Sequence, residues 1–135
     1  MLKWLIAYGA SAAVFVAGDM AWLTLMGPRL YRPVLGPLLA DRFRLLPALA
    51  FYLLYLAGVL VLAVSPALKG ADLRRALASG AVLGLVAYAT YDLTNQATLR
   101  TWATRLSLVD MAWGAVLTAV AAGAGFVAAR TVTTG

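Results

Sequence analysis

LLPALAFYLLYLAGVLVLAVS, residues 45–65, carries no charged side chain at any position. Its length matches the roughly 20 apolar residues that an α-helix needs to cross the hydrocarbon core of a bilayer. The run stops at Pro66, a residue type that removes a helical hydrogen bond and is expected to end a helix. This stretch therefore predicts a membrane-spanning helix over residues 45–65.

The rest of the chain supports the same interpretation. Of its 135 residues, 64% are hydrophobic and 12% are charged, whereas a soluble domain is typically about half apolar and a quarter charged. Further apolar runs occupy residues 4–26, 73–97 and 106–129, and the connections between the runs are short. We therefore predict one all-α domain over residues 1–135, built as a multi-pass bundle of four transmembrane helices.

The longest connection, residues 27–44, separates the first two apolar runs. It begins with Gly27-Pro28, which is expected to end the first helix, and two further prolines argue against one straight helix. Apolar residues alternate there with arginines, a pattern typical of amphipathic turns that lie in the membrane interface. We predict a short interfacial amphipathic segment between helices one and two.

Small residues decide how closely helices approach one another in a bilayer, because lipid tails give helices little hydrophobic reason to associate. Three runs carry small residues at helical spacing: Gly9, Ala13 and Ala17 in the first, Gly80 and Gly84 in the third, and Gly114, Thr118 and Ala122 in the fourth. We therefore expect the first, third and fourth helices to pack most tightly.

Cysteine and histidine are both absent from the sequence. Their absence excludes disulfides, thiolate nucleophiles, Cys-ligated iron–sulfur clusters, and haem or zinc held by histidine. Catalytic triads that depend on histidine are excluded as well. We predict no metal site and no cofactor, which leaves carboxylate, hydroxyl, amide, arginine and aromatic chemistry.

The net charge of +6 comes from 11 Lys+Arg against 5 Asp+Glu. The basic residues fall in short gaps between apolar runs, where such residues anchor a protein to anionic lipid headgroups. No basic cluster of the kind that binds nucleic acid is present. The expected partner is therefore the lipid bilayer, and nucleic acid is not expected.

Connectivity places the acidic residues of the apolar runs at one level of the membrane. We call side A the side of the N-terminus, the second loop and the C-terminus, and side B the side of the first and third loops. Asp19, Asp92 and Asp110 then all fall in the side-B halves of their helices. A charged side chain near the centre of a spanning helix costs roughly 2.5–3.5 kcal/mol, so each acid is expected to need a partner.

Aromatic and amide side chains accompany these acids. Asp-Met-Ala-Trp occurs twice, and residues three apart share one face of a helix. We predict a ligand-binding site, with no catalytic residue assigned, formed by Asp19, Trp22, Tyr52, Tyr55, Tyr88, Asp92, Asn95, Asp110 and Trp113. The arginines of the side-B loops are expected at its rim, beside lipid headgroups: Arg29, Arg32, Arg42, Arg44, Arg100 and Arg105.

A structural interpretation of the acids stays open beside this one. Asp110 can stabilise the N-terminus of the fourth helix, where the helix dipole favours an anion. Asp92 can pair with an arginine of the third loop, and Asp19 with Arg29. Tryptophan and tyrosine also gather at membrane interfaces without any binding role.

Three stretches resemble a known family. They are GLVAYATYDLTNQATLRTWATRLSLVDMAWGAV at 84–116, FVAGDMAWL at 15–23 and FYLLYLAGV at 51–59. The chain resembles, over nearly its whole length, the bacterial predicted integral membrane proteins of unknown function grouped as DUF2177. The resemblance implies four spanning helices and a bacterial inner (cytoplasmic) membrane. It implies no activity, substrate or cofactor.

Three kinds of function fit these features. The first is binding or transport of a small polar or cationic solute, including proton-coupled transport, at the acidic and aromatic site. The second is a lipid-modifying enzyme, or an accessory subunit that binds a lipid or apolar ligand; whether the protein is an enzyme is left open. The third is a structural or assembly partner of another membrane protein.

Assembly and orientation are less constrained by the sequence. Small four-helix transporters can work as dimers, so a homodimer is one expectation. The loops of side B carry six arginines, and side A carries five basic side chains and the amino terminus. Because the positive-inside rule depends on an imbalance, these charges do not orient the chain in the membrane.

Overall fold

The computed structural model describes residues 1–133 and is helical, without strands, in that part of the chain. Its elements are α1 (Leu2–Met26), the π-helical turn η1 (Gly27–Tyr31), α2 (Arg32–Leu35), the 3-10 turn η2 (Gly36–Leu38), α3 (Leu45–Val59), the π-helical turn η3 (Leu60–Val64), α4 (Ser65–Gly70), α5 (Leu73–Thr98) and α6 (Thr104–Thr133). Within the described residues, four continuous helical stretches are long and apolar enough to cross a membrane. The predicted all-α fold with four spanning helices is confirmed.

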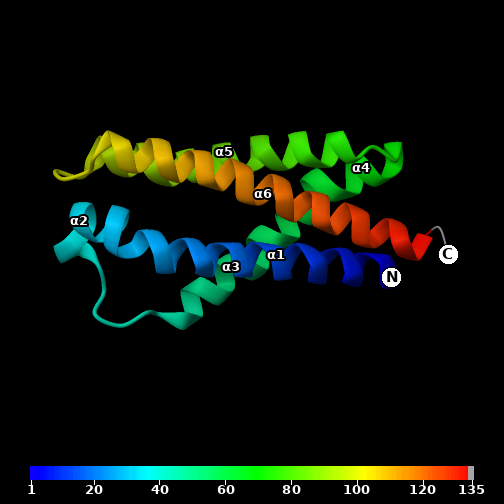
Figure 1. Cartoon of the computed structure of the whole chain (residues 1–135), viewed down its shortest axis with the longest axis horizontal. Coiled ribbons are helices and arrows are strands. Elements are labelled where there is room, and N and C mark those ends of the chain that lie inside the picture. Colours follow the sequence, from blue (N-terminus) through cyan, green and yellow to red (C-terminus); the bar gives the residue numbers. More distant parts are fainter. Residues whose placement is uncertain (134–135) are drawn as a thin grey trace.

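The two ends of the bundle match the predicted sides of the membrane. The N-terminus, the end of α6 and the α4–α5 turn lie at one end (Figure 1). α2 and the connection between α5 and α6 lie at the other. Side A and side B are therefore real ends of the molecule.

The first two spanning helices continue past the prolines at which the sequence predicted that they would end. Gly27-Pro28 was expected to terminate the first helix, yet the chain continues through η1, α2 and η2 to Leu38. Pro66 was expected to terminate the second, yet that helix runs on through η3 and α4 to Gly70. Both corrections have one physical cause. A π turn widens the helix and shifts its carbonyl groups, so that a nearby proline ring fits.

The segment after α1 is amphipathic, as predicted. Leu30 and Leu35 are buried and form a small apolar cluster with Leu106 of α6, while Arg29 and Arg32 are exposed. Beyond η2, residues 39–44 are exposed and irregular and lead to α3. This arrangement holds the end of α1 against α6 on side B.

α6 is the helix against which α1 and α5 pack over much of their lengths. On α5, a Cβ atom at Gly84 would stand 2.1 Å from the carbonyl oxygen of Gly114, so no larger residue fits between the two backbones. On α1, the Ser11 hydroxyl donates a 2.8 Å hydrogen bond to the carbonyl oxygen of Ala121. The expected tight packing of the first, third and fourth helices is confirmed.

The predicted contact stripe on the first helix is wrong. Gly9, Ala13 and Ala17 are exposed, and the space around Gly9 holds no atom within 4 Å of a built Cβ. α1 instead buries Ala7, Ser11 and Phe15. Each lies two positions before a residue of the predicted stripe, which places the packed face on nearly the opposite side of the helix. Small residues occur on more than one face of this alanine-rich helix, so their spacing alone did not identify the packed face.

Candidate functional site

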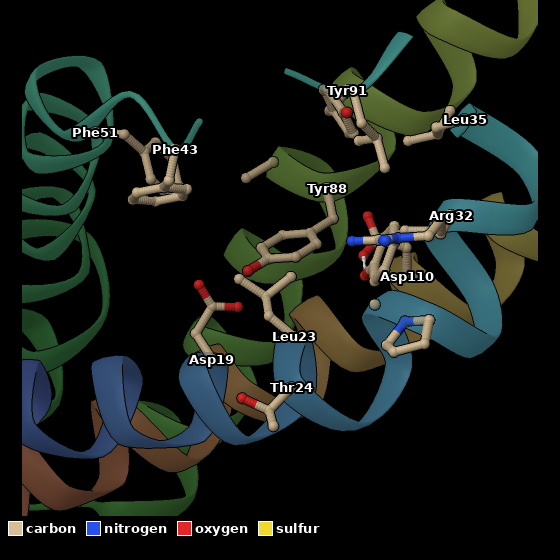
Figure 2. Close-up of a pocket in the computed structure, with 15 residues that line it drawn as sticks. Asp19, Leu23, Thr24, Arg32, Leu35, Phe43, Phe51, Tyr88, Tyr91 and Asp110 are labelled. Atoms are coloured by element: carbon tan, nitrogen blue, oxygen red, sulfur yellow. Dashed lines mark hydrogen bonds between the residues drawn. The ribbon is translucent and has the colours of Figure 1, made fainter. Parts of the chain in front are cut away.

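A cavity of about 770 Å³ opens in the side-B half of the bundle. We call it the side-B cavity; it lies among the end of α1, η1 with α2, the middle of α5 and the start of α3 (Figure 2). Its lining consists of Asp19, Leu23, Thr24, Gly27, Pro28, Tyr31, Arg32, Leu35, Leu39, Phe43, Phe51, Ala87, Tyr88, Tyr91 and Asp110. The wall is mostly apolar and aromatic, with two carboxylates and one guanidinium.

Asp19 reaches the cavity from α1, and its carboxyl group projects into the same space as the Tyr88 ring in Figure 2. The Tyr52 hydroxyl of α3 donates a hydrogen bond to one of its oxygens. The Tyr52 ring lies edge-on to Phe15, with ring centroids 5.9 Å apart. Since Phe15 is fully buried, this contact fixes the tyrosine that holds Asp19.

Asp110 is held by a chain of hydrogen bonds that crosses three elements. The Trp22 indole N–H of α1 donates to the Tyr31 hydroxyl over 2.7 Å. The Tyr31 hydroxyl of η1 in turn donates to a carboxyl oxygen of Asp110 on α6. Asp110 thus has a tyrosine as its partner, and the carboxylate is placed at the cavity wall.

The two Asp-Met-Ala-Trp strings meet through their tryptophans. Trp22 and Trp113 stack with ring centroids 4.5 Å apart and an angle of 6° between the planes. They also border a second, shallower pocket of about 420 Å³. The Trp113 indole nitrogen is buried and faces Asp19, but it has no hydrogen-bond partner in the described part of the chain.

Asp92 lies behind the cavity and is 0% exposed. Its carboxyl group is close enough to Asp110 for the two to interact electrostatically. Neither carboxyl oxygen has a hydrogen-bond partner among residues 1–133. The predicted pairing of Asp92 with Arg100 or Arg105 is therefore not what the structure contains.

The remaining predicted site residues divide into two groups. Tyr88 lines the cavity, and it interacts electrostatically with both Asp19 and Asp110. Tyr55 instead forms a 2.8 Å hydrogen bond between its hydroxyl and that of Thr118. Asn95 is partly exposed on α5 and does not contribute to the cavity lining.

Only one of the predicted rim arginines reaches the cavity. Arg32 of α2 is part of the lining, and in Figure 2 its guanidinium group extends toward the side of the cavity where Asp110 lies. The other five are exposed and do not line it: Arg29, Arg42, Arg44, Arg100 and Arg105. They lie at the side-B end of the molecule, where headgroup contact remains their expected role.

Several lining residues were absent from the predicted site. Tyr31 and Tyr91 supply hydroxyl-bearing rings, and Phe43 and Phe51 form an apolar wall on the α3 side (Figure 2). Phe51 and Tyr91 lie close in the sequence to aromatic residues of the predicted site, so the sequence offered a reason to include them. Tyr31 gave none, because the helix was expected to end before it.

The acidic side chains of the cavity wall determine which charge this site favours. Within residues 1–133, no three acidic side chains gather closely enough to hold a metal ion. Asp19 and Asp110 interact electrostatically with each other as well as with Tyr88. Two carboxylates that share one low-dielectric space repel each other, and a positive charge between them relieves that repulsion.

Comparison with known proteins identifies a family and nothing closer. The model of the family described as predicted membrane protein (DUF2177) matches residues 4–127. No curated protein matches the chain, and no solved structure matches it.

Proposed function

The chain belongs to the DUF2177 family of predicted membrane proteins, and we propose that it binds a small organic cation with an apolar body in the side-B cavity. The observation that carries this proposal is the presence of two carboxylates, Asp19 and Asp110, in the wall of one cavity inside a membrane-spanning bundle. Ionisable residues inside a membrane are costly and mark binding or transport sites by default.

The hydrogen bonds of these carboxylates leave room for a ligand. An ionised carboxylate has about four lone-pair sites. Tyr52 uses a site on Asp19, and Tyr31 uses a site on Asp110. Each tyrosine therefore fixes the position of its carboxylate while lone pairs remain for a positive charge in the cavity.

The aromatic walls of the cavity suit the apolar body of such a cation. Tyr88, Tyr91 and Phe51 offer ring faces or edges to the cavity, and a cation within about 6 Å of an aromatic ring is attracted to its face. A volume of about 770 Å³ lies within the roughly 300–1,000 Å³ that small-molecule pockets occupy. An aromatic or aliphatic ammonium ion fits both the volume and the lining.

On one side the cavity is bordered by α3, a helix whose outward side chains are largely exposed. Leu46 and Leu54 of α3 are 80% and 76% exposed, and in Figure 1 the start of α3 lies apart from α5, on the far side of α1. Phe43 and Phe51 are exposed as well. An apolar body entering from the bilayer would meet aromatic and leucine side chains before its charge meets Asp19.

Transport requires more than this cavity. The side-A half is closely packed around Ala7, Val64 and Phe126, and a built Cβ at Gly125 would stand 2.2 Å from the Ser11 hydroxyl. Passage of the cation to side A would need this half to open. The structure fits the side-B-open state of a transporter, and binding is the part of the function that its geometry supports.

A second candidate, lipid binding, rests on Arg32. A guanidinium in the lining, with Leu35 and Leu39 close by, suits the phosphate group and acyl chain of an anionic lipid. In that case the protein would be a lipid-binding accessory subunit or a lipid-modifying enzyme, with the carboxylates available for acid–base chemistry.

Binding of benzyltrimethylammonium to the purified protein in mild detergent tests the first proposal. We expect Asp19→Asn to weaken binding about 10- to 100-fold, because it removes a charge–charge contact of the usual strength. Asp41→Asn is the matched control, since it removes the same charge from an exposed loop residue on side B. Isothermal titration calorimetry measures both.

Equal affinity of the two variants would refute the role of Asp19. Native mass spectrometry of the same preparation decides between the two candidates. A tightly retained anionic lipid, together with no measurable binding of the ammonium probe, would favour the lipid function instead.

The cellular location follows from the family likeness rather than from the cavity. The four apolar helices and the family description make this a multi-pass membrane protein. The inner membrane of a bacterium is our proposal for that membrane, in line with the resemblance noted in the sequence.

A further inference from the structure

Asp92 is a buried acid whose carboxyl group accepts no hydrogen bond from any donor group of the described residues. It is 0% exposed, and both of its carboxyl oxygens lack a hydrogen-bond partner in the described residues. A buried polar group without a partner costs free energy. An acid held at such a position in a membrane helix therefore calls for a functional explanation.

The polar side chains of Gln96, Thr104 and Ser107 and the Trp102 indole hydrogen-bond to one another and not to the Asp92 carboxyl group. The Ser107 hydroxyl lies 2.7 Å from the side-chain oxygen of Gln96 and accepts a 2.9 Å hydrogen bond from the Trp102 indole. Gln96 also donates to the Thr104 hydroxyl over 2.9 Å. Toward Asp92, Ser107 reaches only the main-chain carbonyl, at 3.4 Å. This network ties α5 to α6 without using the Asp92 carboxyl group.

Asp110 is the group that connects Asp92 to the cavity. It interacts directly with Asp92, it is 5% exposed, and it lines the cavity that Asp92 itself does not line. The other titratable groups that face Asp92 are Tyr31 of η1 and Tyr91 of its own helix. Both are phenols, so neither brings a positive charge to Asp92. Asp110 itself is faced from the cavity by the carboxylate of Asp19 and the phenol of Tyr88, and the guanidinium of Arg32 extends toward its side of the cavity (Figure 2).

We propose that Asp92 and Asp110 together hold one proton, and that this proton leaves through the cavity when a cation binds at Asp110. The inference rests on the proposed binding function. Two adjacent carboxyl groups sharing one proton carry one negative charge, whereas two ionised groups would repel each other. A bound cation replaces the charge of the proton, so the site keeps the same total charge before and after exchange.

The exchange balances in atoms and charge. The O–H bond of the Asp92–Asp110 pair breaks, and a water molecule in the cavity accepts the proton. The cation then lies against the ionised Asp110 carboxylate, with the ionised Asp92 behind it, and no oxidant or further reactant is involved. Because binding and proton release are linked, each ligand weakens the binding of the other by the same factor.

Proton release on cation binding is the first measurement. Titration of wild-type protein with benzyltrimethylammonium, which has no proton of its own to lose, is carried out in two buffers of different ionisation enthalpy. We expect about one proton released per cation bound. Asp92→Asn is expected to bind the cation and release almost no proton, whereas Asp41→Asn should behave as the wild type does.

Infrared spectroscopy tests the bound proton without any cation. The wild type should show the C=O stretching band of a protonated carboxyl group, lost as the pH rises, and the band should be missing from Asp92→Asn. Asp92→Leu, close in volume and apolar, serves as a second variant should the amide disturb folding. Absence of the band from the wild type, or equal proton release by wild type and Asp92→Asn, overturns the proposal.

The two measurements also separate this inference from the proposed function. A wild type that shows the carboxyl band but binds no ammonium probe would retain the shared proton, and it would refute both the cation site and the exchange. A wild type that binds the probe without proton release would keep the cation site and refute the exchange alone.

Discussion

Gly114 and Tyr88 face each other across the contact between α5 and α6. A Cβ atom built on Gly114 would stand 2.2 Å from Cγ of the Tyr88 ring, a distance that atoms in a folded protein do not tolerate. The ring that packs on this glycine is also part of the cavity lining. One missing side chain on α6 therefore lets a phenol of α5 become a wall of the site.

Gly114→Ala is expected to destabilise the protein by about 1–3 kcal/mol, the usual cost of overpacking a well-packed contact. It should also weaken binding of the ammonium probe, because the displaced ring is Tyr88. The matched control is Gly9→Ala, at an exposed helical glycine with no atom within 4 Å of the new methyl group. Reversible unfolding in mixed detergent micelles measures the free energy of each variant.

The control should be neutral or slightly more stable than the wild type, since alanine favours a helix over glycine by roughly 0.5–1 kcal/mol. Similar losses from both substitutions would show that the ring contact at Gly114 carries no special cost.

For single residues, the sequence predicted how deep a side chain lies in the membrane better than it predicted which face of its helix packs against a neighbour. Asp19, Asp92 and Asp110 were placed in one half of the membrane by connectivity alone, and in the structure their carboxyl groups interact. The small-residue stripe of the first helix was placed on the wrong face. Depth follows from counting residues along a helix, whereas the packed face depends on its rotation, which several small-residue stripes leave undecided.

The π turns are the elements that the sequence did not reveal. η1 is wider than an α-helix, with hydrogen bonds that span five residues in place of four, so it rotates its own last residues, and those that follow, relative to α1. That rotation directs the Tyr31 hydroxyl to Asp110 and Leu30 into the apolar cluster with Leu106. A proline predicts that a helix is disturbed, but it does not predict whether the helix ends or continues through a π turn. Because the helix was expected to end at Gly27-Pro28, Tyr31 was missed as a site residue.

The α4–α5 turn depends on a residue in an unfavourable conformation. Ala71 has φ of 52° and ψ of 38°, the left-handed region, which costs most L-residues roughly 1–2 kcal/mol. Asp72 follows it and caps α5 by accepting a 2.9 Å hydrogen bond from the Arg74 amide. The turn is thus fixed by the cap, and its alanine carries strain that glycine would not.

Ala71→Gly is therefore expected to raise the free energy of unfolding by up to about 1 kcal/mol, after the added flexibility of glycine in the unfolded chain is subtracted. The control is Ala78→Gly, at an exposed position inside α5. This substitution should lower the free energy of unfolding by about 1 kcal/mol. Thermal or detergent unfolding compares the two. A loss of stability at both positions would contradict the strain assigned to Ala71.

The whole molecule consists of a packed half and a hollow half. On side A, buried alanines and Phe126 fill the space between helices, and the N-terminus and the end of α6 lie at that end (Figure 1). On side B, α3 leans away and the cavity takes the place of a core. The hydropathy of the sequence predicted four spans, but it could not predict this asymmetry, because hydropathy does not report how α3 tilts against the other helices.

This asymmetry predicts where a ligand changes the dynamics of the chain. Residues 39–44 are exposed, lie outside any helix and bring Leu39 and Phe43 to the cavity wall. They should exchange their amide hydrogens fastest among the connections, because local opening needs few contacts to break.

Hydrogen exchange followed by mass spectrometry, with and without benzyltrimethylammonium, checks this expectation. The ligand should slow exchange in residues 39–44, since it fills the space that these residues border. The α4–α5 turn at Ala71 and Asp72 is equally exposed but lies on side A, and its exchange should not change. Equal slowing at both connections would mean that the cation stabilises the fold as a whole rather than occupying the side-B cavity.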